Sequence, residues 1–560
     1  MLQNTKRFYY FILSLFFIAA CSKKESTPAP TPTPPAALVF TGAKIDNAGA
    51  FTSAANYNVR VMPSVKLSFN NAVDRTLVST GVTLKESGGP NVTVNYTYEN
   101  GDSTVVLTPS SPLKYLTRYV ATAETSLKSS KGGALLLQAS VTLITQIDSA
   151  RKFPVITDDA LLTLVQQQTF KYFWDFGHPV SGLARERNTS ADVVTSGGSG
   201  FGVMAIITGV SRNFITRSQG LTRLQTMVSF LKNTAQKFHG AFPHWLNGAT
   251  GAAVPFSTKD DGADLVETSY LMQGLLCARQ YFNGTDAAEI ALRNDINTLW
   301  NNVEWSWFRK SSENVLYWHW SPNYAWDMNM PIRGWNECLI TYVLAASSQN
   351  YSIPKSVYDN GWAQNGAMKN NNTYYGYQLP LGSASGGPLF FAHYSFMGIN
   401  PNGLNDVYAN YATQTKNHTL INYNYCKTNP NGYYGYSDSV WGLTASDIPS
   451  GYTASSPTND VGVIAPTAAL SSFPYTPTES MKALKFFYYV LGDKIWKEYG
   501  FVDAFKLNDL WFANSFLAID QGPIIVMIEN HRTGLLWNLF TSCPEVKTGM
   551  TNLGFTAPYL

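Results

Sequence analysis

The chain has 560 residues and a formal net charge of +3, and 14% of its residues are aromatic. This length allows two domains with a large core. The near-neutral charge excludes the strong basic field of nucleic-acid-binding proteins and disfavours a polyanionic substrate. The cysteines beyond residue 21 have no paired spacing, so the sequence indicates neither a disulfide framework nor a zinc site.

The first 21 residues have the features of an export signal. Lys6 and Arg7 precede an apolar run over residues 8–20, which is too short to span a bilayer as a mature helix. The run ends in small residues followed by Cys21, which resembles the lipobox of bacterial lipoproteins. We therefore expect acyl chains on Cys21 to hold the protein on a membrane, facing the periplasm or at the outer surface. The alternative is an ordinary cleaved signal peptide with an incidental cysteine.

Residues 22–37 form a tether rich in proline and threonine, which favours an extended chain without a core. Residues 38–147 then read as β-structure. Apolar and polar residues alternate over 65–69 and 92–98, and a turn sequence follows at 99–102. The segment resembles bacterial Ig-like modules and predicts a small β-sandwich. We interpret it as a spacer without a ligand, because a fold alone does not imply a binding site.

The chain from residue 155 to 560 has a helical pattern, so the protein is mainly α. About 400 residues of helices and Gly/Asn-rich loops fit an α/α toroid of about twelve helices, with loops lining a pocket at one end. Apolar residues at helical spacing predict helices over 161–176, 201–210, 221–238, 265–282, 335–346, 481–491 and 523–540.

The first cluster of candidate catalytic residues lies at 260–270. The abundant aromatic residues offer planes on which sugar rings can stack, and hydrolysis of a bond between sugars needs two carboxyl groups. Carboxylates within aromatic, polar segments are therefore the residues of interest. If this segment opens a helix, Asp261, Asp264 and Glu267 share one face. A favourable interaction with the helix dipole explains Asp260 and Asp261 well but Glu267 poorly. Asp264 and Glu267 are therefore candidates for a functional role.

The second cluster follows the densest aromatic stretch of the chain, residues 317–326, and ends at Glu337. We expect Glu337 in the first turn of a helix, where the dipole would lower its pKa, whereas burial against Trp335 would raise it. The sequence leaves open which effect prevails, and a simple helix-start glutamate is the alternative. Sugar rings stack on aromatic planes, so the candidate substrate-binding residues here are Trp320, Trp326, Arg333, Trp335 and Asn336.

Two further clusters complete the candidate site. His393 could be either structural or a ligand of a sugar hydroxyl. Asp520 precedes Pro523 at a helix start, where it could simply order that start. We expect Glu529 and Arg532, three residues apart in an apolar helix, to form a structural ion pair. The remaining candidate substrate-binding residues are Phe390, His393, Tyr394, Trp441 and Asp447.

Several of these segments together resemble the glucoamylase-like domain of glycoside hydrolase family 144. The resemblance extends over residues 155–545 and is carried by 262–268 (GADLVET), 334–337 (GWNE), 388–396 (PLFFAHYSF), 417–422 (NHTLIN), 441–447 (WGLTASD), 465–474 (APTAALSSFP) and 519–530 (IDQGPIIVMIEN).

This resemblance implies an (α/α)6 toroid that hydrolyses β-1,2-glucan with inversion and releases sophorose or sophoro-oligosaccharides, without a metal or cofactor. It implies Glu337 as the proton donor and places Asp264 and Glu267 among the essential acidic residues. Asp520 and Asp447 are the other candidates for activating water. Cleavage at chain ends and cleavage within chains both occur in the family, and the sequence does not distinguish them.

Two other functions compete with the hydrolase. A non-catalytic surface lipoprotein that binds glycan would share the tether, the Ig-like module and the aromatic residues. A polysaccharide lyase would need basic residues to neutralise a uronate, and no obvious Arg/Lys cluster stands among the aromatics. We expect a monomer that acts on a β-glucan and binds no nucleic acid.

Overall fold

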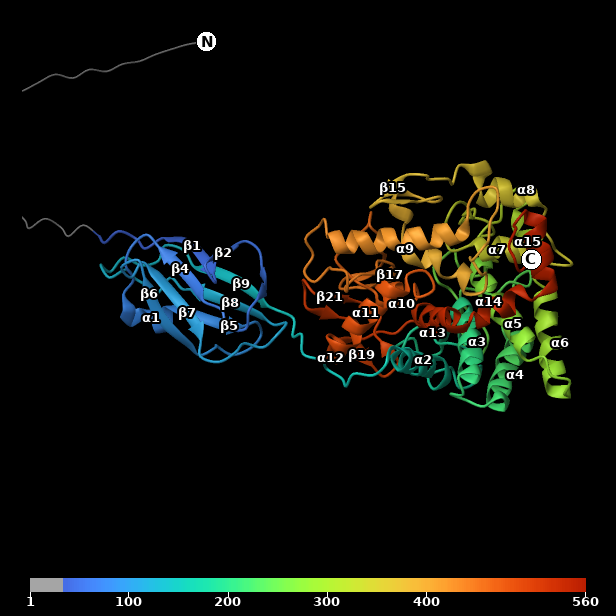
Figure 1. Ribbon diagram of the computed structural model, residues 1–560, viewed down its shortest axis with the longest axis horizontal. Helices are drawn as coiled ribbons and strands as arrows, with labels where there is room; N and C mark the ends of the chain where they lie inside the picture. Colours follow the sequence, from blue (N-terminus) through green and yellow to red (C-terminus); the bar gives the residue numbers. More distant parts are fainter. Residues whose placement is uncertain (1–33) are drawn as a thin grey trace, which may run out of the picture. The chain divides into compact units, whose positions relative to one another are not determined.

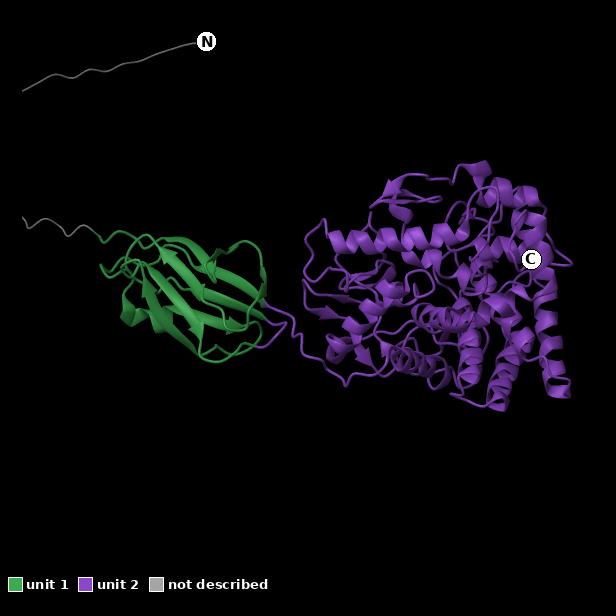
Figure 2. Ribbon diagram, viewed as in Figure 1, with its two compact units in different colours: residues 1–113, 118–144 green, residues 114–117, 145–560 purple. Residues whose placement is uncertain are grey.

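The computed structural model describes residues 34–560, so the expected export signal and Cys21 lie outside the described residues. The described chain folds into two compact units, residues 34–113 with 118–144 and residues 114–117 with 145–560 (Figure 2). Within residues 34–560, no helix combines the length and the apolar character needed to cross a bilayer.

The first unit is the predicted β-sandwich. Its antiparallel strands form two sheets, in the orders β2-β1-β4-β7-β6 and β3-β9-β8-β5. The turn predicted at residues 99–102 joins β6 to β7 as a hairpin. The elements are β1 (Phe40–Ile45), β2 (Ala48–Gly49), β3 (Asn56–Val59), β4 (Val65–Phe69), α1 (Arg75–Gly81), β5 (Val82–Glu86), β6 (Val94–Glu99), β7 (Thr104–Pro109), β8 (Arg118–Ala123) and β9 (Ala139–Thr145).

The second unit is helical, with short two- and three-stranded sheets in its loops (Figure 1). Its longer helices are α2 (Asp158–Trp174), α3 (Ser196–Ser211), α4 (Arg217–Asn233), α5 (Leu265–Tyr281), α6 (Ala287–Asn301), α7 (Leu339–Ser347), α9 (Tyr411–Thr428), α11 (Pro477–Tyr489), α13 (Ala518–Thr533), α14 (Leu535–Thr541) and α15 (Pro544–Leu553). Short helices are α8 (Lys355–Val357), α10 (Pro466–Leu470) and α12 (Gly492–Ile495).

The strands of the second unit are β10 (Val193–Thr195), β11 (Trp245–Asn247), β12 (Ala253–Val254), β13 (Ala263–Asp264), β14 (His319–Trp320), β15 (Thr373–Tyr374), β16 (Tyr377–Gln378), β17 (Ala445–Ile448), β18 (Gly451–Ala454), β19 (Trp496–Lys497), β20 (Gly500–Phe501), β21 (Phe505–Lys506) and β22 (Trp511–Phe512). Most of them form hairpins that connect helices, so they belong to the loops at the ends of the ring.

Burial divides these helices into an inner and an outer layer. Helices α3, α5, α7 and α13 are buried around almost their whole circumference, whereas α4, α6 and α15 bury only one face. A helix that is apolar on all sides belongs inside a fold, and an amphipathic helix covers it. The chain alternates between the layers from α3 to α6, because α3 packs on α4 and α5 on α6, and α15 near the end of the chain covers α7. This alternation is the predicted α/α toroid.

Two predictions about the helices are wrong in detail. The helix expected to start at Pro523 begins at Ala518 and has Pro523 inside it, so Asp520 lies in its first turn. The range 523–540 also contains two helices, α13 and α14, because Gly534 between them has a φ of +70° and ends α13 in the left-handed conformation. The expected ion pair between Glu529 and Arg532 does not form. Instead, Arg532 Nη2 lies 2.6 Å from Asp159 Oδ1, and Glu529 Oε2 lies 2.6 Å from Nε of Arg212.

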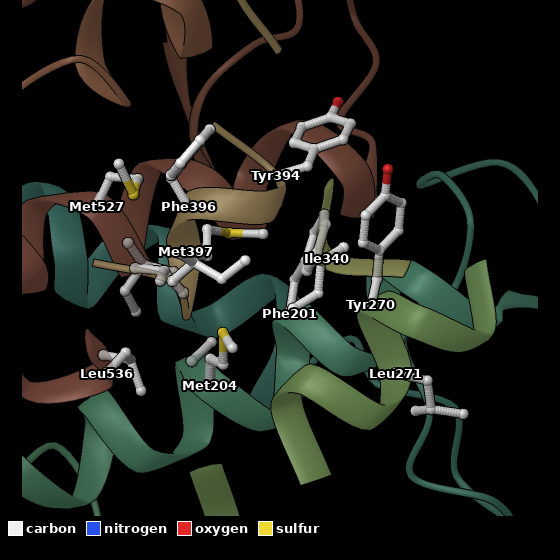
Figure 3. Packing of buried hydrophobic residues seen from close by; sticks show 14 of the residues in the cluster. Phe201, Met204, Tyr270, Leu271, Ile340, Tyr394, Phe396, Met397, Met527 and Leu536 are labelled. Carbon is white, nitrogen blue, oxygen red and sulfur yellow. The ribbon is translucent and has the colours of Figure 1, made fainter. Parts of the chain in front are cut away.

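Inner helices α3 and α5 lie unusually close together, because glycines face each other across the contact. A Cβ atom on Gly274 would lie 2.1 Å from the carbonyl oxygen of Gly200, and one on Gly200 would lie 2.1 Å from that of Tyr270. Phe201 and Tyr270 pack beside this contact with ring centroids 5.3 Å apart (Figure 3). The close approach brings Glu267 on α5 to the first turn of α3.

We expect Gly274→Ala to destabilise the second unit by about 1–3 kcal/mol, because the overlap is with backbone and no side chain can rotate away. All tryptophans lie at residue 174 or beyond, so tryptophan fluorescence during urea unfolding reports on this unit alone. Gly200→Ala should act in the same direction, since its methyl meets the same contact from the other side. Thr551→Ala, on the exposed face of α15, is the control, and equal unfolding midpoints for all three variants would contradict the prediction.

Candidate active site

A cavity of about 430 Å³ opens where the inner helices begin. Thr195 immediately precedes α3, Glu267 lies in the first turn of α5, and Glu337 lies two residues before α7. Ile519 lies in the first turn of α13. The inner helices therefore point their N-terminal ends at one cavity, where their dipoles favour negative charge.

Aromatic side chains form a large part of the walls of this cavity. The ring of His244 stacks on that of Phe256 at 4.2 Å, and Phe256 in turn contacts Trp245. Such a lining, with a few polar groups on the floor, suits the apolar C–H faces and the hydroxyls of sugar rings. The aromatic lining residues are Trp245, Phe256, Tyr270, Trp318, Phe390, Tyr394 and Tyr452.

Glu337 lies in a turn and not in the first helical turn that we expected, because α7 begins at Leu339. Asn336 Oδ1 accepts the backbone N–H of Cys338 and holds this turn, and Ser395 Oγ donates to the carbonyl oxygen of Glu337. Burial, with a smaller contribution from the carboxylates of Glu267 and Asp264, raises the pKa of the Glu337 carboxyl to about 7. Burial therefore prevails over the dipole, and Glu337 keeps a proton near neutral pH.

Asp264 is not on the helix but is its N-cap. Its Oδ1 accepts the backbone N–H groups of Val266 and Glu267, each at 2.9 Å, and the side chain is completely buried. Its Oδ2 accepts from His244 Nδ1 at 3.2 Å and from Trp318 Nε1 at 3.3 Å. Burial opposes the charge of Asp264, but these hydrogen bonds and the neighbouring histidines lower its pKa overall.

Glu267 shares the cavity wall with Glu337. Its Oε2 accepts from the backbone N–H of Gly197 at 2.8 Å and from Thr195 Oγ1 at 3.2 Å. Burial raises the pKa of Glu267, and the Asp264 carboxylate adds to this, whereas the charge of His244 lowers it. Of the two glutamates, Glu267 is thus the one with a cation beside it.

His244 carries that charge. Burial opposes protonation of its ring, but Glu267, Asp264 and Asp260 together raise its pKa to about 9. His244, Asp260 and Asp264 offer ligand atoms within 4.8 Å of one another, a spacing that could hold a metal ion. A protonated imidazole has no lone pair to give a metal, and Asp264 Oδ2 already accepts two hydrogen bonds. The cluster is thus better described as a hydrogen-bonded network than as a metal site.

A second carboxyl cluster joins Asp447, Asp503 and Asp520. Asp447 is held by Arg187 Nη1 at 3.2 Å and by Ser515 Oγ at 2.5 Å, and its backbone N–H donates to Asp503 Oδ2 at 2.6 Å. Asp503 and Asp520 are both buried and hydrogen-bonded to each other. Burial raises the pKa of Asp503 to about 7, and burial together with the charge of Asp503 raises that of Asp520 well above its usual range. This pair therefore shares a proton at neutral pH.

The predicted site residues separate into two groups. Glu337, Glu267, Phe390 and Tyr394 line the cavity, Asp264 lies directly behind it, and Asp447 lines an adjacent cavity. The other predicted site residues line neither cavity and instead make structural contacts. These are Trp320 and Trp326 packed on Trp307, Arg333 bonded to the carbonyl of Asn360, Trp335 against Phe396, Asn336 in its turn, His393 bonded to Ser472, buried Trp441 and Asp520.

Sequence reasoning missed His244, Arg187 and Asp503. A signal existed for His244, which stands beside Trp245 in a polar, glycine-containing loop similar to those that were selected. Arg187 is the basic partner of the adjacent Glu186 and of Asp447, and the second contact joins residues 260 positions apart in the sequence. Asp503 has no local signal, because only its burial next to Asp520 distinguishes it.

Comparison with known proteins agrees with this architecture. The family model described as "Putative glucoamylase" matches residues 329–544, and that of a bacterial Ig-like domain matches residues 49–145. An exo β-1,2-glucooligosaccharide sophorohydrolase of Parabacteroides distasonis is 47% identical over 430 residues, which is 73% of this chain and 59% of that protein. The chain thus matches about three fifths of that relative's length.

Two solved structures are also similar. An endo-β-1,2-glucanase of Chitinophaga pinensis, in complex with sophorotriose and glucose, is 52% identical with a TM-score of 0.71, and the match covers 72% of this chain and 100% of that one. A β-1,2-glucanase of Parabacteroides distasonis is 39% identical with a TM-score of 0.70, and the match covers 92% of this chain and 73% of that one.

The helical toroid and the carboxyl groups at the floor of its aromatic cavity define a glycoside hydrolase of the toroid class. Within that class the identities above are decisive: the chain belongs to glycoside hydrolase family 144, with its glucoamylase-like domain preceded by a bacterial Ig-like domain.

Proposed function

We propose that the protein hydrolyses β-1,2-glucan with inversion at the anomeric carbon. The observation that carries this proposal is the pair of carboxyl groups on one aromatic cavity, Glu337 with a raised pKa and Glu267 beside a charged histidine. The β-1,2 linkage rests on the similar enzymes, which are named for that glucan.

In this mechanism Glu337 is the general acid and Glu267 the general base. Glu337 transfers its proton to the glycosidic oxygen as the bond from that oxygen to the anomeric carbon breaks. Glu267 takes a proton from water, whose oxygen bonds to the anomeric carbon from the opposite face. Inverting enzymes hold the two carboxyl groups about 6.5–9.5 Å apart to admit this water.

The other candidate bases are less well placed for that role. Asp264 is sealed from the cavity and both of its oxygens accept hydrogen bonds, so we assign it the positioning of His244 and of the start of α5. Asp520 is buried and shares a proton with Asp503. Asp447 lines the adjacent cavity and is neutralised by Arg187.

We expect kcat/KM on β-1,2-glucan to fall above about pH 7. Glu337 is protonated below its pKa, so raising the pH through that value removes the acid and the rate, by about tenfold for each further pH unit. At lower pH, protonation of Glu267 removes the general base. Because burial raises the pKa of Glu267, the pH range of full activity is narrower on this side. A pH–rate profile that stays level from neutral to alkaline pH would show that Glu337 is not the acid.

Incubation with linear β-1,2-glucan tests the function directly. The expected result is new reducing ends, with the product released initially as the α-anomer because inversion converts a β-linkage. Tight binding without product would identify a glycan-binding protein, and unsaturated products would identify a lyase. Product sizing separates the two modes of cleavage, since a disaccharide alone indicates action at chain ends and a ladder indicates action within chains.

We further propose that the protein is an exported, monomeric lipoprotein anchored through Cys21. The support is the short apolar run after Lys6 and Arg7, the small residues before the cysteine, and the proline-rich tether after it. Cys21→Ala should abolish incorporation of labelled fatty acid and release the protein from the membrane fraction, whereas Cys426→Ala should not. Membrane association that survives Cys21→Ala would contradict this assignment.

A further inference from the structure

A second cavity, of about 590 Å³, adjoins the one that holds Glu337. The two cavities share Arg187 and Tyr452 in their linings, so they are neighbours across these two side chains. Tyr452 lies on β18, in the hairpin formed with β17, and is 49% exposed. A ligand too long for the first cavity would therefore pass Tyr452 and Arg187 into the second.

The second cavity has an aromatic wall and a fixed polar edge. Trp511 and Phe512 form β22, and both side chains are half-buried, which leaves part of each ring accessible. Asn188 Nδ2 donates to the carbonyl oxygen of Asn514 at 3.0 Å, and Asn188 Oδ1 accepts the backbone N–H of Phe516 at 3.1 Å. These bonds fix the edge that presents the exposed Asn514 side chain.

The floor of the second cavity carries one guanidinium that is paired with two carboxylates of the protein, so the group has no excess positive charge. The Arg187 guanidinium is bound by the Glu186 carboxylate at 2.9 Å and by the Asp447 carboxylate at 3.2 Å. With its charge compensated in this way, Arg187 offers hydrogen bonds but no free positive charge to an anion. The cavity therefore suits a neutral polyhydroxyl ligand better than a uronate or a phosphate.

We propose that the second cavity binds further glucosyl units of the same glucan chain that the first cavity cleaves, with Trp511 as the platform on which a sugar ring stacks. Both cavity volumes fall within the range of about 300–1,000 Å³ that is usual for ligand pockets. The inference rests on the proposed function. Binding in the second cavity makes this enzyme select long glucan chains over short ones.

The test compares kcat/KM on β-1,2-glucan polymer with that on a β-1,2-linked trisaccharide. In Trp511→Ala the value for the polymer should fall by roughly tenfold, the factor that corresponds to about 1.4 kcal/mol of lost binding. The value for the trisaccharide should change less than twofold, and the loss on polymer should appear mainly in KM. Asn514→Ala, at an exposed position that endangers the fold less, should shift the same ratio in the same direction.

Trp174→Ala is the matched control, because Trp174 is a half-buried ring on α2 that lines neither cavity. An unchanged polymer-to-trisaccharide ratio in both Trp511→Ala and Asn514→Ala would overturn the second binding site. If the unaltered enzyme cleaves neither substrate, the proposed function fails instead, so the two failures are distinguishable.

Discussion

Replacing Glu337 with glutamine is expected to lower kcat on β-1,2-glucan by about 10²–10⁴-fold while leaving the unfolding midpoint unchanged. The amide has nearly the same shape as the carboxyl group but has no acidic proton to transfer. The backbone carbonyl of Glu337, which accepts from Ser395, is unaffected by the exchange, so the turn before α7 should persist. Initial rates of reducing-end release measure the loss of activity. Tryptophan fluorescence during urea unfolding measures the unfolding midpoint.

A substrate with a good leaving group separates loss of the acid from a structural fault. An aryl β-sophoroside needs little protonation of its leaving oxygen, so Glu337→Gln should retain much of its rate on that substrate. Glu267→Gln should lose activity on both substrates, because water activation is needed in each case. Glu479→Gln on α11, which lines neither cavity, should match the unaltered enzyme. Full activity of Glu337→Gln on the glucan would remove Glu337 from the mechanism.

The helical spacing of apolar residues was sufficient to predict most of the inner layer of the fold. Helices α3, α5 and α13 are so apolar that their sequences read as buried. The same pattern did not reveal α6, α9 or α15, which lie among polar residues and are helical because one face packs on the ring. The break at Gly534 was also missed, since a glycine inside an apolar run ends a helix only if the chain turns there.

The site was predictable to the extent that its chemistry is local. Glu337 stood out because it follows the densest aromatic stretch, and Glu267 because the helix dipole explains a carboxylate at its position poorly. Their relation to one another was not predictable, because it depends on how α5 packs on α7, where Ser269 Oγ lies 2.9 Å from Thr341 Oγ1. The role of Asp264 as a helix cap depends on where α5 begins, and a shift of one residue would have placed it on the helix face.

The tryptophans show that composition alone does not predict which aromatic side chains face the substrate cavity. Trp320, Trp326, Trp335 and Trp441 lie in the same kind of segment as Trp318, yet only Trp318 faces the cavity. Regular strand alternation would place Trp318 and Trp320 on the same side. Instead, Trp318 Nε1 donates to Asp264 Oδ2 beside the cavity, whereas Trp320 packs on Trp307. The local turn of the chain then decides which ring faces the substrate, and the sequence pattern does not record that turn.

The buried ion pair between Arg212 and Glu529 gives the largest expected effect on stability. Glu529 on α13 is completely buried, and its carboxylate accepts from Arg212 at 2.6 Å, from Gln166 on α2 at 2.9 Å and from Thr533 at 2.7 Å. Arg212 immediately follows α3, so this carboxylate links three helices of the toroid. We expect Arg212→Met to destabilise the second unit by about 3–5 kcal/mol, because it leaves a buried carboxylate without its cation.

The double variant Arg212→Met/Glu529→Leu distinguishes this cause from loss of packing. Removing both charges also removes the cost of burying an unpaired carboxylate, so the double variant should be more stable than Arg212→Met alone even though it has lost more native atoms. Urea unfolding followed by tryptophan fluorescence measures all the variants on the same unit. If the losses from the two single variants simply add in the double variant, the two side chains act independently and the ion pair is not what joins α3 to α13.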